Sequence, residues 1–267
     1  MNKHIIYLAA GSGSRFGSNK LLCPLEGKPL FRHGLDTLAG LVRARKDCDL
    51  TIVSRYGPVL EAAQAAGARA VDSPDSARGL SFTIRAGLSA LSPISPEDFL
   101  LFAAADQPRL GSGTAARLLD AARPGVLTAA ACWEGQPGNP VLFSAALLPE
   151  LEALTGDQGG RVVLRRHWDR CILLPAEDPL ELADADTPEA LLALRQGEGF
   201  HQIGQAAIFL RQNGVQDQPI VHGVEGDHGL CGDFGDLSSR AGGDVDLADR
   251  PLGEEIEVLA PQHGGVA

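Results

Sequence analysis

Short apolar runs alternate with amphipathic segments along most of the chain. The apolar runs are bounded by Gly, Pro, Asp or Ser and lie at residues 4–10, 50–54, 69–73, 98–105, 126–132 and 171–175. Runs that are apolar throughout predict strands buried on both faces. Between them, apolar side chains recur at helical spacing, as in Phe31, Leu35, Leu38 and Val42, and in Leu80, Ile84, Leu88 and Leu91. The alternation predicts a three-layer α/β fold: a mostly parallel, Rossmann-like sheet with helices on both faces and ligands at the carboxyl ends of its strands.

The chain changes character after its last helical pattern. Thr187 and Pro188 suit an N-cap and a first helical position, and the predicted helix runs to about Arg195. Residues 198–267 hold 13 of the 32 glycines, and their 12 acidic residues against 3 arginines give a net charge of −9. Their few apolar residues would not offset the entropy of ordering the segment. We therefore expect a folded domain over residues 1–197 and an irregular, acidic and flexible C-terminal appendage over residues 198–267.

The formal net charge of −11 says little about the folded domain, because most of it belongs to the appendage. Residues 1–197 carry 22 acidic and 20 basic side chains, a net charge of −2. Without a basic stripe, a nucleic-acid-binding surface is not expected. No run approaches the roughly 20 apolar residues of a membrane helix. Residues 4–10 pass into a glycine-rich loop rather than a signal-peptide cleavage site, and the five cysteines form no C-x-x-C pair. These features predict a cytoplasmic protein with reduced thiols and no membrane partner.

The first predicted strand ends in a glycine-rich loop, L-A-A-G-S-G-S-R-F-G, that begins at Leu8. Gly11 and Gly13 lack a Cβ, so backbone N–H groups can approach a phosphate closely, and Arg15 and Lys20 can neutralise its charge. The spacing is not that of a Walker loop and is at best related to the dinucleotide fingerprint. The glycines alone are equally well explained by an ordinary glycine-rich turn.

Carboxylates stand at the ends of two predicted segments. Asp106 follows the strand over 98–105, and Asp184 and Asp186 precede the Thr187 cap. An Asp at the carboxyl end of a central strand is well placed to hold Mg²⁺, which prefers oxygen ligands and retains phosphate oxygens and waters. Each also has a simpler explanation, a turn residue for Asp106 and helix-dipole complementarity for the pair. Together with the basic loop, the three favour a metal–triphosphate site.

Several motifs occur in a fixed order between residues 8 and 190. They are L-A-A-G-S-G-S-R-F-G-S-N-K, G-K-P-L, A-D-Q-P, G-N-P-V-L-F, G-D-Q-G-G-R and D-A-D-T-P-E. In this order they resemble the MobA-like nucleotidyltransferases, and within that family they are most similar to the molybdenum cofactor cytidylyltransferases. The resemblance implies a single-domain, GT-A-like α/β fold and an enzyme that transfers a nucleoside monophosphate from an NTP to a phosphorylated acceptor, releasing pyrophosphate.

The resemblance also implies roles for individual residues. The nucleotide would be bound by Leu8, Ala9, Ala10, Gly11, Gly13, Arg15, Lys20, Ser81 and Thr83. Mg²⁺ would be held by Asp106 and Asp186, with Asp184 as the other candidate. The acceptor would be bound by Gly138, Asn139, Pro140, Asp157 and Arg161. The chain departs from the family pattern at Ala105, Asn139 and Gly160, where Gly, His and Ala are usual, and Asn139 makes the identity of the acceptor the open question.

The mechanism implied by the resemblance needs no acid or base from the protein, because the acceptor phosphate is already a nucleophile. Catalysis then consists of bringing two polyanions together, aligning attack on the α-phosphorus and stabilising the leaving pyrophosphate. Arg15, Lys20, Asp106 and Asp186 are therefore the expected catalytic residues.

Two features favour CTP as the nucleotide. Ala10 gives L-A-A-G, which resembles the cytidylyl branch of the family, whereas L-A-G-G resembles the guanylyl branch. The stretch that begins at Gly79 resembles the G-x-S-x-S-[LI] stretch of the cytidylyl branch, with Ser81 and Thr83 at the hydroxyl positions. Without the family, simple helix N-capping would be the preferred explanation for these two hydroxyls.

The expected partners are CTP, a molybdopterin-type acceptor, and a molybdoenzyme or its maturation factor. Three alternatives stay open. The same fold could act with GTP or on a sugar or alditol phosphate. The chain could be a non-catalytic molybdoenzyme maturation factor. It could be a nicotinamide-dependent oxidoreductase, although that class usually has an acid at the end of the second strand, and residues 50–57 contain none.

Overall fold

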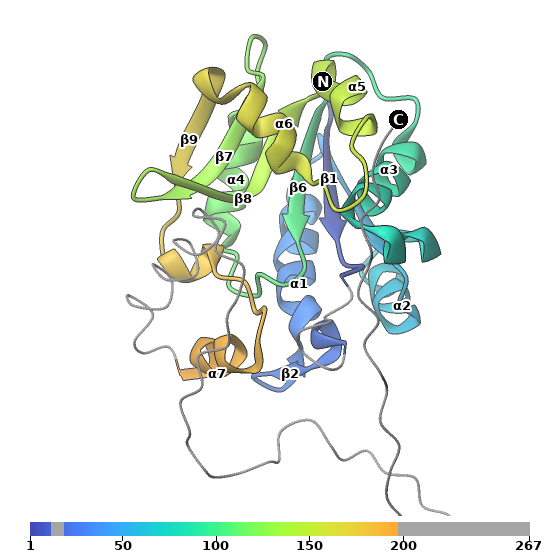
Figure 1. Ribbon diagram of the computed structural model, residues 1–267, viewed down its shortest axis with the longest axis vertical. Coiled ribbons are helices and arrows are strands. Elements are labelled where there is room, and N and C mark those ends of the chain that lie inside the picture. The colour runs from blue at the N-terminus through green and yellow to red at the C-terminus, as the bar shows by residue number, and fades with distance from the viewer. Residues whose placement is uncertain (12–18, 197–267) are drawn as a thin grey trace, which may run out of the picture. The chain divides into compact units, whose positions relative to one another are not determined.

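A twisted seven-stranded sheet forms the centre of the protein in the computed structural model, which describes residues 1–11 and 19–196 (Figure 1). The strands run β5, β4, β1, β6, β8, β7, β9 across the sheet. They are β1 (Lys3–Leu8), β4 (Cys48–Ser54), β5 (Arg69–Asp72), β6 (Phe99–Ala104), β7 (Thr128–Trp133), β8 (Gln136–Ser144) and β9 (Cys171–Pro175). All neighbours pair in parallel except β8, which is antiparallel to both β6 and β7. The predicted mostly parallel sheet is confirmed.

The six predicted strands are all present, with bounds shifted by at most two residues. The sequence pattern did not predict β8, because its second to fifth residues, Pro137-Gly138-Asn139-Pro140, are types that favour a turn. β8 returns from β7 through Glu134 and Gly135, both of which have positive φ. It pairs with β6 only from Phe102↔Val141 onward, so its first residues extend beyond the paired part of β6.

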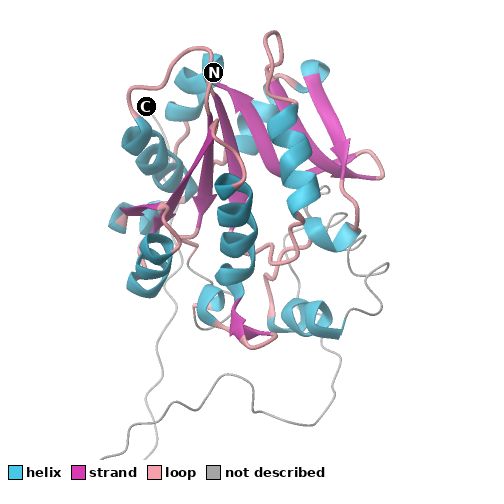
Figure 2. Cartoon of the chain, turned by 180° about the vertical axis from the view of Figure 1, so that it is seen from behind, coloured by secondary structure: helices cyan, strands magenta, loops and turns pink. Residues whose placement is uncertain are grey.

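Helices cover both faces of the sheet, as predicted. They are α1 (Leu30–Arg43), α2 (Gly57–Ala65), α3 (Leu80–Leu91), α4 (Ser112–Asp120), α5 (Leu148–Glu152), α6 (Gly160–Arg166) and α7 (Pro188–Gln196). A short hairpin, β2 (Pro24–Leu25) with β3 (Lys28–Pro29), precedes α1. Figure 1 views the molecule from the side of α5 and α6, and Figure 2 shows the opposite face with α1 and α4 in front of the sheet.

The alternation of side chains along β1 divides the core into two. Ile5 and Tyr7 pack with α1, α2, α4 and α7, whereas Ile6 packs with α3, α5 and α6. This is the period-two geometry of a strand buried on both faces. On the first side, the Tyr7 hydroxyl donates to the carbonyl oxygen of Phe31 at 2.8 Å, and Gly34 provides the space, since a Cβ there would lie 2.5 Å from the hydroxyl oxygen.

The last predicted helix is also confirmed. The Thr187 hydroxyl accepts from the backbone N–H of Ala190 at 3.2 Å, and Leu191 and Leu194 of α7 are buried in the core shared with α1 and α4. The predicted domain end at residue 197 falls at the edge of the described chain, and the predicted appendage over residues 198–267 lies outside it. No helix within residues 1–11 and 19–196 is both long and apolar enough to cross a membrane.

Candidate active site

The ammonium of Lys20 lies between two carboxylates that come from distant parts of the chain. Lys20 Nζ is 2.9 Å from Asp106 Oδ2 and 2.7 Å from Asp186 Oδ1. Lys20 opens a short 3-10 turn (Lys20–Leu22) whose first backbone groups are capped by the Asn19 side chain. Asp106 follows β6, and Asp186 directly precedes the Thr187 cap of α7. Three of the four predicted catalytic residues therefore meet at the carboxyl edge of the sheet.

Backbone hydrogen bonds fix the two carboxylate segments against the first strand. The N–H of Ala105 donates to the carbonyl oxygen of Leu8 at 3.1 Å, and the N–H of Ala185 donates to the carbonyl oxygen of Asp106 at 2.8 Å. Nearly buried Gln107 adds a side-chain bond, since its Nε2 donates to the carbonyl oxygen of Leu182 at 3.1 Å. Sequence reasoning did not single out Gln107. The only signal for it was its place between Asp106 and Pro108.

The charge balance of this group keeps Lys20 protonated. The Lys20 side chain is 9% exposed, against 24% for Asp106 and 31% for Asp186. Burial lowers the pKa of Lys20, but the charges of Asp106 and Asp186 and their hydrogen bonds to the ammonium outweigh it, so the pKa lies above its ordinary value. One positive charge thus faces two carboxylates at a site open to solvent on the carboxylate side.

These residues fit a divalent cation. Both carboxylates direct an oxygen at one cation, here the Lys20 ammonium, and oxygen is what Mg²⁺ prefers. Within the described part of the chain, no three His, Cys, Asp or Glu side chains gather as a metal site, so Asp184 does not complete a three-carboxylate group with Asp106 and Asp186. Two carboxylates suit an ion whose other ligands are phosphate oxygens and waters.

The beginning of the glycine-rich loop is tied to the end of β4. Ala9 donates its N–H to Val53 and accepts from the Ser54 hydroxyl, at 2.9 and 2.8 Å, and the Tyr56 hydroxyl donates to the carbonyl oxygen of Gly11 at 2.9 Å. Leu8, Ala9 and Ala10 line this end of β1, with Ala9 and Ala10 buried. Gly13 and Arg15 lie outside the described residues.

The start of α3 lies against the loop that carries Asp157. Gly79, at φ +134°, precedes the helix, and a Cβ on it would lie 2.4 Å from the carbonyl oxygen of Gly156. The same oxygen accepts from the N–H of Ser81 at 3.0 Å. The structure thereby joins the predicted nucleotide-binding stretch to the predicted acceptor-binding loop, whose Asp157 and Arg161 are exposed.

Ser81 and Thr83 do not serve as helix caps. The N-cap position of α3 is Gly79, without a side-chain cap hydrogen bond, so the N-capping explanation for these hydroxyls is wrong. Both side chains are buried, and Ser81 Oγ has no hydrogen-bond partner within the described structure. A buried hydroxyl without a partner is uncommon.

The predicted acceptor residues Gly138, Asn139 and Pro140 lie at the start of β8, apart from Asp157 and Arg161. Asn139 Nδ2 donates to Gln107 Oε1 at 3.1 Å. With its oxygen and nitrogen exchanged, the same amide accepts from the N–H of Ala104 at 2.8 Å and donates to the carbonyl oxygen of Phe102 at 3.1 Å. In the first orientation Asn139 joins β8 to the loop that follows β6, and in the second it joins β8 to β6 itself. A Cβ on Gly138 would lie 3.0 Å from Leu182 Cδ1.

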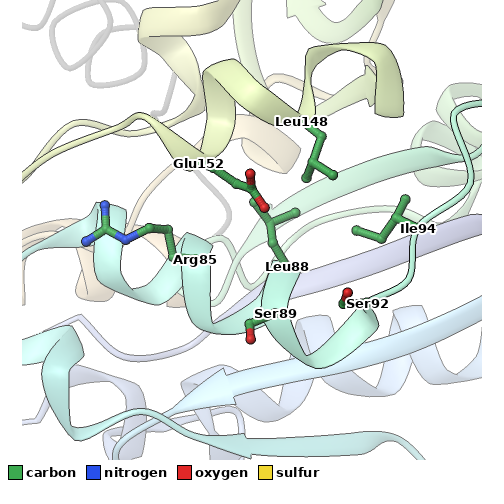
Figure 3. A pocket seen from close by; sticks show the side chains of 7 residues that line it. All are labelled: Arg85, Leu88, Ser89, Ser92, Ile94, Leu148 and Glu152. Atoms are coloured by element: carbon green, nitrogen blue, oxygen red, sulfur yellow. The ribbon is translucent and has the colours of Figure 1, made fainter.

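A separate hollow lies toward the other end of α3. It has a volume of about 310 Å³ and is lined by Arg85, Leu88, Ser89, Ser92, Ile94, Leu148 and Glu152 (Figure 3). Its lining includes none of the predicted site residues. This hollow is therefore separate from the Lys20 site.

Comparison with known proteins identifies the family. A family model described as MobA-like NTP transferase domain matches residues 5–171. The chain is 30% identical to nicotine blue oxidoreductase of Paenarthrobacter nicotinovorans over 197 residues, covering 71% of this chain and 94% of the relative. It is 27% identical to purine catabolism protein PucB of Bacillus subtilis over 201 residues, covering 69% and 91%.

Solved structures agree on the fold. Rv0371c of Mycobacterium tuberculosis matches with a TM-score of 0.61 at 24% identity, over 73% of this chain and 98% of that chain, and has also been solved in complex with manganese. Molybdopterin-guanine dinucleotide biosynthesis protein A of Archaeoglobus fulgidus matches with a TM-score of 0.54 at 18% identity, over 72% and 97%. The family match covers more than half of the chain, including the Lys20 and Asp106 segments. The chain therefore belongs to the MobA-like NTP transferase family, a family of nucleotidyltransferases.

Proposed function

We propose that the protein transfers CMP from CTP to the terminal phosphate of a molybdopterin-type acceptor. The observation that supports this most directly is the convergence of Lys20, Asp106 and Asp186, with the Asp106 segment bonded to Leu8 at the end of β1. In the reaction, an acceptor phosphate oxygen forms a bond to the α-phosphorus of CTP, the bond to the bridging oxygen of the β-phosphate breaks, and pyrophosphate leaves. No protein group needs to gain or lose a proton.

The chain's own residues would bind and orient the substrates. Lys20 is positioned to neutralise charge on the triphosphate, together with Arg15 of the same loop. Asp106 and Asp186 would hold Mg²⁺, which when bound would offset charge on the triphosphate and the leaving group. The backbone bond between Ala185 and Asp106 holds the segments that carry the two carboxylates together, and would thereby help to position the phosphates of both substrates.

Selection of CTP would depend on the end of β1 and the start of α3. Ala10 is buried, and its methyl group would limit the room for a larger base. Ser81 Oγ, without a partner within the described chain, is a hydroxyl that a small rearrangement of α3 could offer to a base. The acceptor would lie between the Asp157 loop and the start of β8, where Arg161 is exposed and Asn139 lies beside Gln107.

A second candidate is an NADP-dependent oxidoreductase. The relative named nicotine blue oxidoreductase favours it, and so does Arg55 at the end of β4, where a basic residue can accommodate the 2′-phosphate of NADP. Arg55 lies over the ring of Tyr56, 5.0 Å from its centroid. This candidate gives no role to the carboxylate pair around Lys20, and we therefore place it second.

One experiment separates these candidates. Pyrophosphate release is measured with CTP, GTP or ATP and Mg²⁺, with and without molybdenum cofactor, and NADPH binding is measured in parallel. Acceptor-dependent release with CTP supports the first proposal. Release with GTP would make GTP the nucleotide substrate in place of CTP. Release that requires a sugar or alditol phosphate would replace the molybdopterin-type acceptor. NADPH binding that Arg55→Ala abolishes, without pyrophosphate release from any NTP, supports the oxidoreductase.

A further inference from the structure

Lys20 occupies the point at which Asp106 and Asp186 converge, and the proposed metal needs the same two carboxylates. Both contacts are within hydrogen-bonding distance, 2.9 Å to Asp106 Oδ2 and 2.7 Å to Asp186 Oδ1. We propose that Lys20 acts as an internal substitute cation: it opposes metal binding in the nucleotide-free protein and gives up the carboxylates when the triphosphate binds. This inference rests on the proposed function, in that it takes Asp106 and Asp186 as the metal ligands.

The charges of the three side chains support a competition between Lys20 and the metal for the two carboxylates. One ammonium between two carboxylates leaves a net charge of −1, whereas without Lys20 the pair would present −2 to a divalent ion. A divalent ion bound to both carboxylates would also lie within a few ångströms of the ammonium, and two cations at such a distance repel strongly. The Lys20 side chain is only 9% exposed, so solvent screens this repulsion less than it would between two surface charges.

The position of Lys20 in the chain explains how the competition ends. Lys20 begins the turn that directly follows the glycine-rich loop, so its side chain starts from the segment proposed to bind phosphates. A triphosphate is a more highly charged partner for the ammonium than either carboxylate alone. When Lys20 moves to a phosphate, both carboxylates become available to the metal. Metal and nucleotide should therefore each strengthen the binding of the other, as linkage requires.

The test measures binding of Mn²⁺ alone to the full-length protein, by electron paramagnetic resonance titration without acceptor. Lys20→Met removes the charge and keeps much of the side-chain volume. Without nucleotide, we expect this variant to bind Mn²⁺ at least about tenfold more tightly than the unmodified protein. Adding CTP should strengthen Mn²⁺ binding to the unmodified protein much more than to the variant. Unchanged or weaker Mn²⁺ binding by Lys20→Met overturns the inference.

A matched control is available at Lys28. Its Nζ is 2.9 Å from Asp36 Oδ2, and both side chains are about 40% exposed, outside the proposed metal site. Lys28→Met should leave Mn²⁺ affinity unchanged, and an equal gain in both lysine variants would show a general charge effect and overturn the inference.

Two further variants separate this inference from the metal site and from folding. Asp106→Asn should abolish Mn²⁺ binding. If Asp106→Asn abolishes Mn²⁺ binding but Lys20→Met binds Mn²⁺ no more tightly than the unmodified protein, the proposed metal site stands and the inference about Lys20 fails. If Asp106→Asn still binds Mn²⁺, both the metal site and the inference fail. Lys20→Gln offers a smaller polar replacement should the Met variant unfold. For either Lys20 variant, Mn²⁺ should raise the melting temperature by more than it does for the unmodified protein, and an equal rise contradicts the inference.

Discussion

The backbone N–H of Ala185 donates a hydrogen bond to the carbonyl oxygen of Asp106 at 2.8 Å. This bond joins the loop after β6 to the segment before α7, although the two are far apart in sequence. Ala185 is fully buried, so the side chains on either side of it, Asp184 and Asp186, are held in fixed directions. Of the two, Asp186 contacts Lys20. The relationship explains why one acid of the D-A-D motif joins Asp106 around the same ammonium.

Replacement of Asp186 should therefore damage catalysis more than replacement of Asp184. We expect Asp186→Asn to lower kcat/KM for CMP transfer by about 100-fold or more, because it removes charge that would hold the metal and Lys20. Asp184→Asn should cost less than about tenfold. Pyrophosphate release at a fixed Mg²⁺ concentration measures both, with thermal unfolding as the control for folding. The opposite ranking would assign the second metal ligand to Asp184.

Asp106→Asn should abolish CMP transfer and leave the protein folded. The side chain is 24% exposed and lies in a loop, whereas the backbone of that loop is held by Ala105 and Ala185 independently of the carboxylate. Turnover is measured over a range of Mg²⁺ concentrations, beside a thermal unfolding curve. Turnover like that of the unmodified protein at low Mg²⁺ would remove Asp106 from the proposed site.

Ala10→Gly should relax the preference for CTP toward GTP. The Ala10 side chain is 4% exposed just after β1, and the replacement removes its methyl group from the proposed binding site of the base. One methyl group in a pocket is worth only about 1–3 kcal/mol of discrimination, so the effect should be moderate. The measured quantity is the ratio of kcat/KM for CTP and GTP. If that ratio does not change, the base is selected elsewhere, and Ser81 and Thr83 become the next positions to replace.

The pH dependence of stability should include a contribution from His4, which lies at the amino end of β1, at the opposite end of the strand from the Lys20 site. His4 Nδ1 lies 2.7 Å from Asp49 Oδ2, and Nε2 lies 3.5 Å from Asp98 Oδ2. The hydrogen bond to Asp49 is the largest cause that raises the pKa of His4 above 6.5, with Asp98 adding to it against the effect of burial. Protonated His4 is thus favoured in the folded state. Its stabilising effect is complete below pH 6.5 and is lost as the pH rises through the folded-state pKa.

Chemical denaturation at a series of pH values tests this. The free energy of unfolding should fall between pH 6.5 and the folded-state pKa, and His4→Gln should remove that part of the slope. His33 is the matched control, because burial lowers its pKa. Its contribution to stability is lost as the pH falls, so His33→Gln should reduce the loss of stability toward acid and leave the slope above pH 6.5 unchanged. An unaltered pH profile in His4→Gln would show that the Asp49 contact does not contribute to stability.

Local pattern was sufficient for most of the fold. Six strands, the α1, α3 and α7 helices and the Thr187 cap follow from apolar periodicity and capping residues, which act over a few positions. β8 was missed because Pro137, Gly138, Asn139 and Pro140 are residue types that favour turns. Pairing of Gln136 and Pro137 with β7 overrides that preference. The spacing of apolar residues over 136–140 does not indicate that this segment pairs with a neighbouring strand.

The site was predictable in its residue types and less so in its contacts. Position at a strand end and the family motifs both pointed to Lys20, Asp106 and Asp186. That the lysine bridges the two acids depends on the Ala185 bond and on Gln107, which are tertiary contacts across distant segments. The contact of Gly79 with Gly156 is of the same kind. It depends on a positive φ and a close backbone approach, which no spacing rule anticipates.

Removal of residues 197–267 should leave a folded and active enzyme. The core of the described residues already includes α7, through Leu191 and Leu194, and Arg195 Nη2 donates to the carbonyl oxygen of Pro24 at 2.5 Å. Arg109 fixes the same helix by donating to the carbonyl oxygen of Leu194 at 2.6 Å. A chain that ends at Gln196 keeps all of these contacts, so its melting temperature and CTP affinity should equal those of the full chain.

A chain that ends at Thr187 is the matched comparison, because it lacks α7. Each buried leucine is worth about 1.5–3 kcal/mol, so loss of Leu191 and Leu194 should lower the melting temperature clearly. CTP affinity should fall with it, since Asp186 would then lie at an untethered chain end. If the chain ending at Gln196 instead loses melting temperature and CTP affinity together, part of residues 198–267 belongs to the catalytic domain and the predicted boundary is wrong.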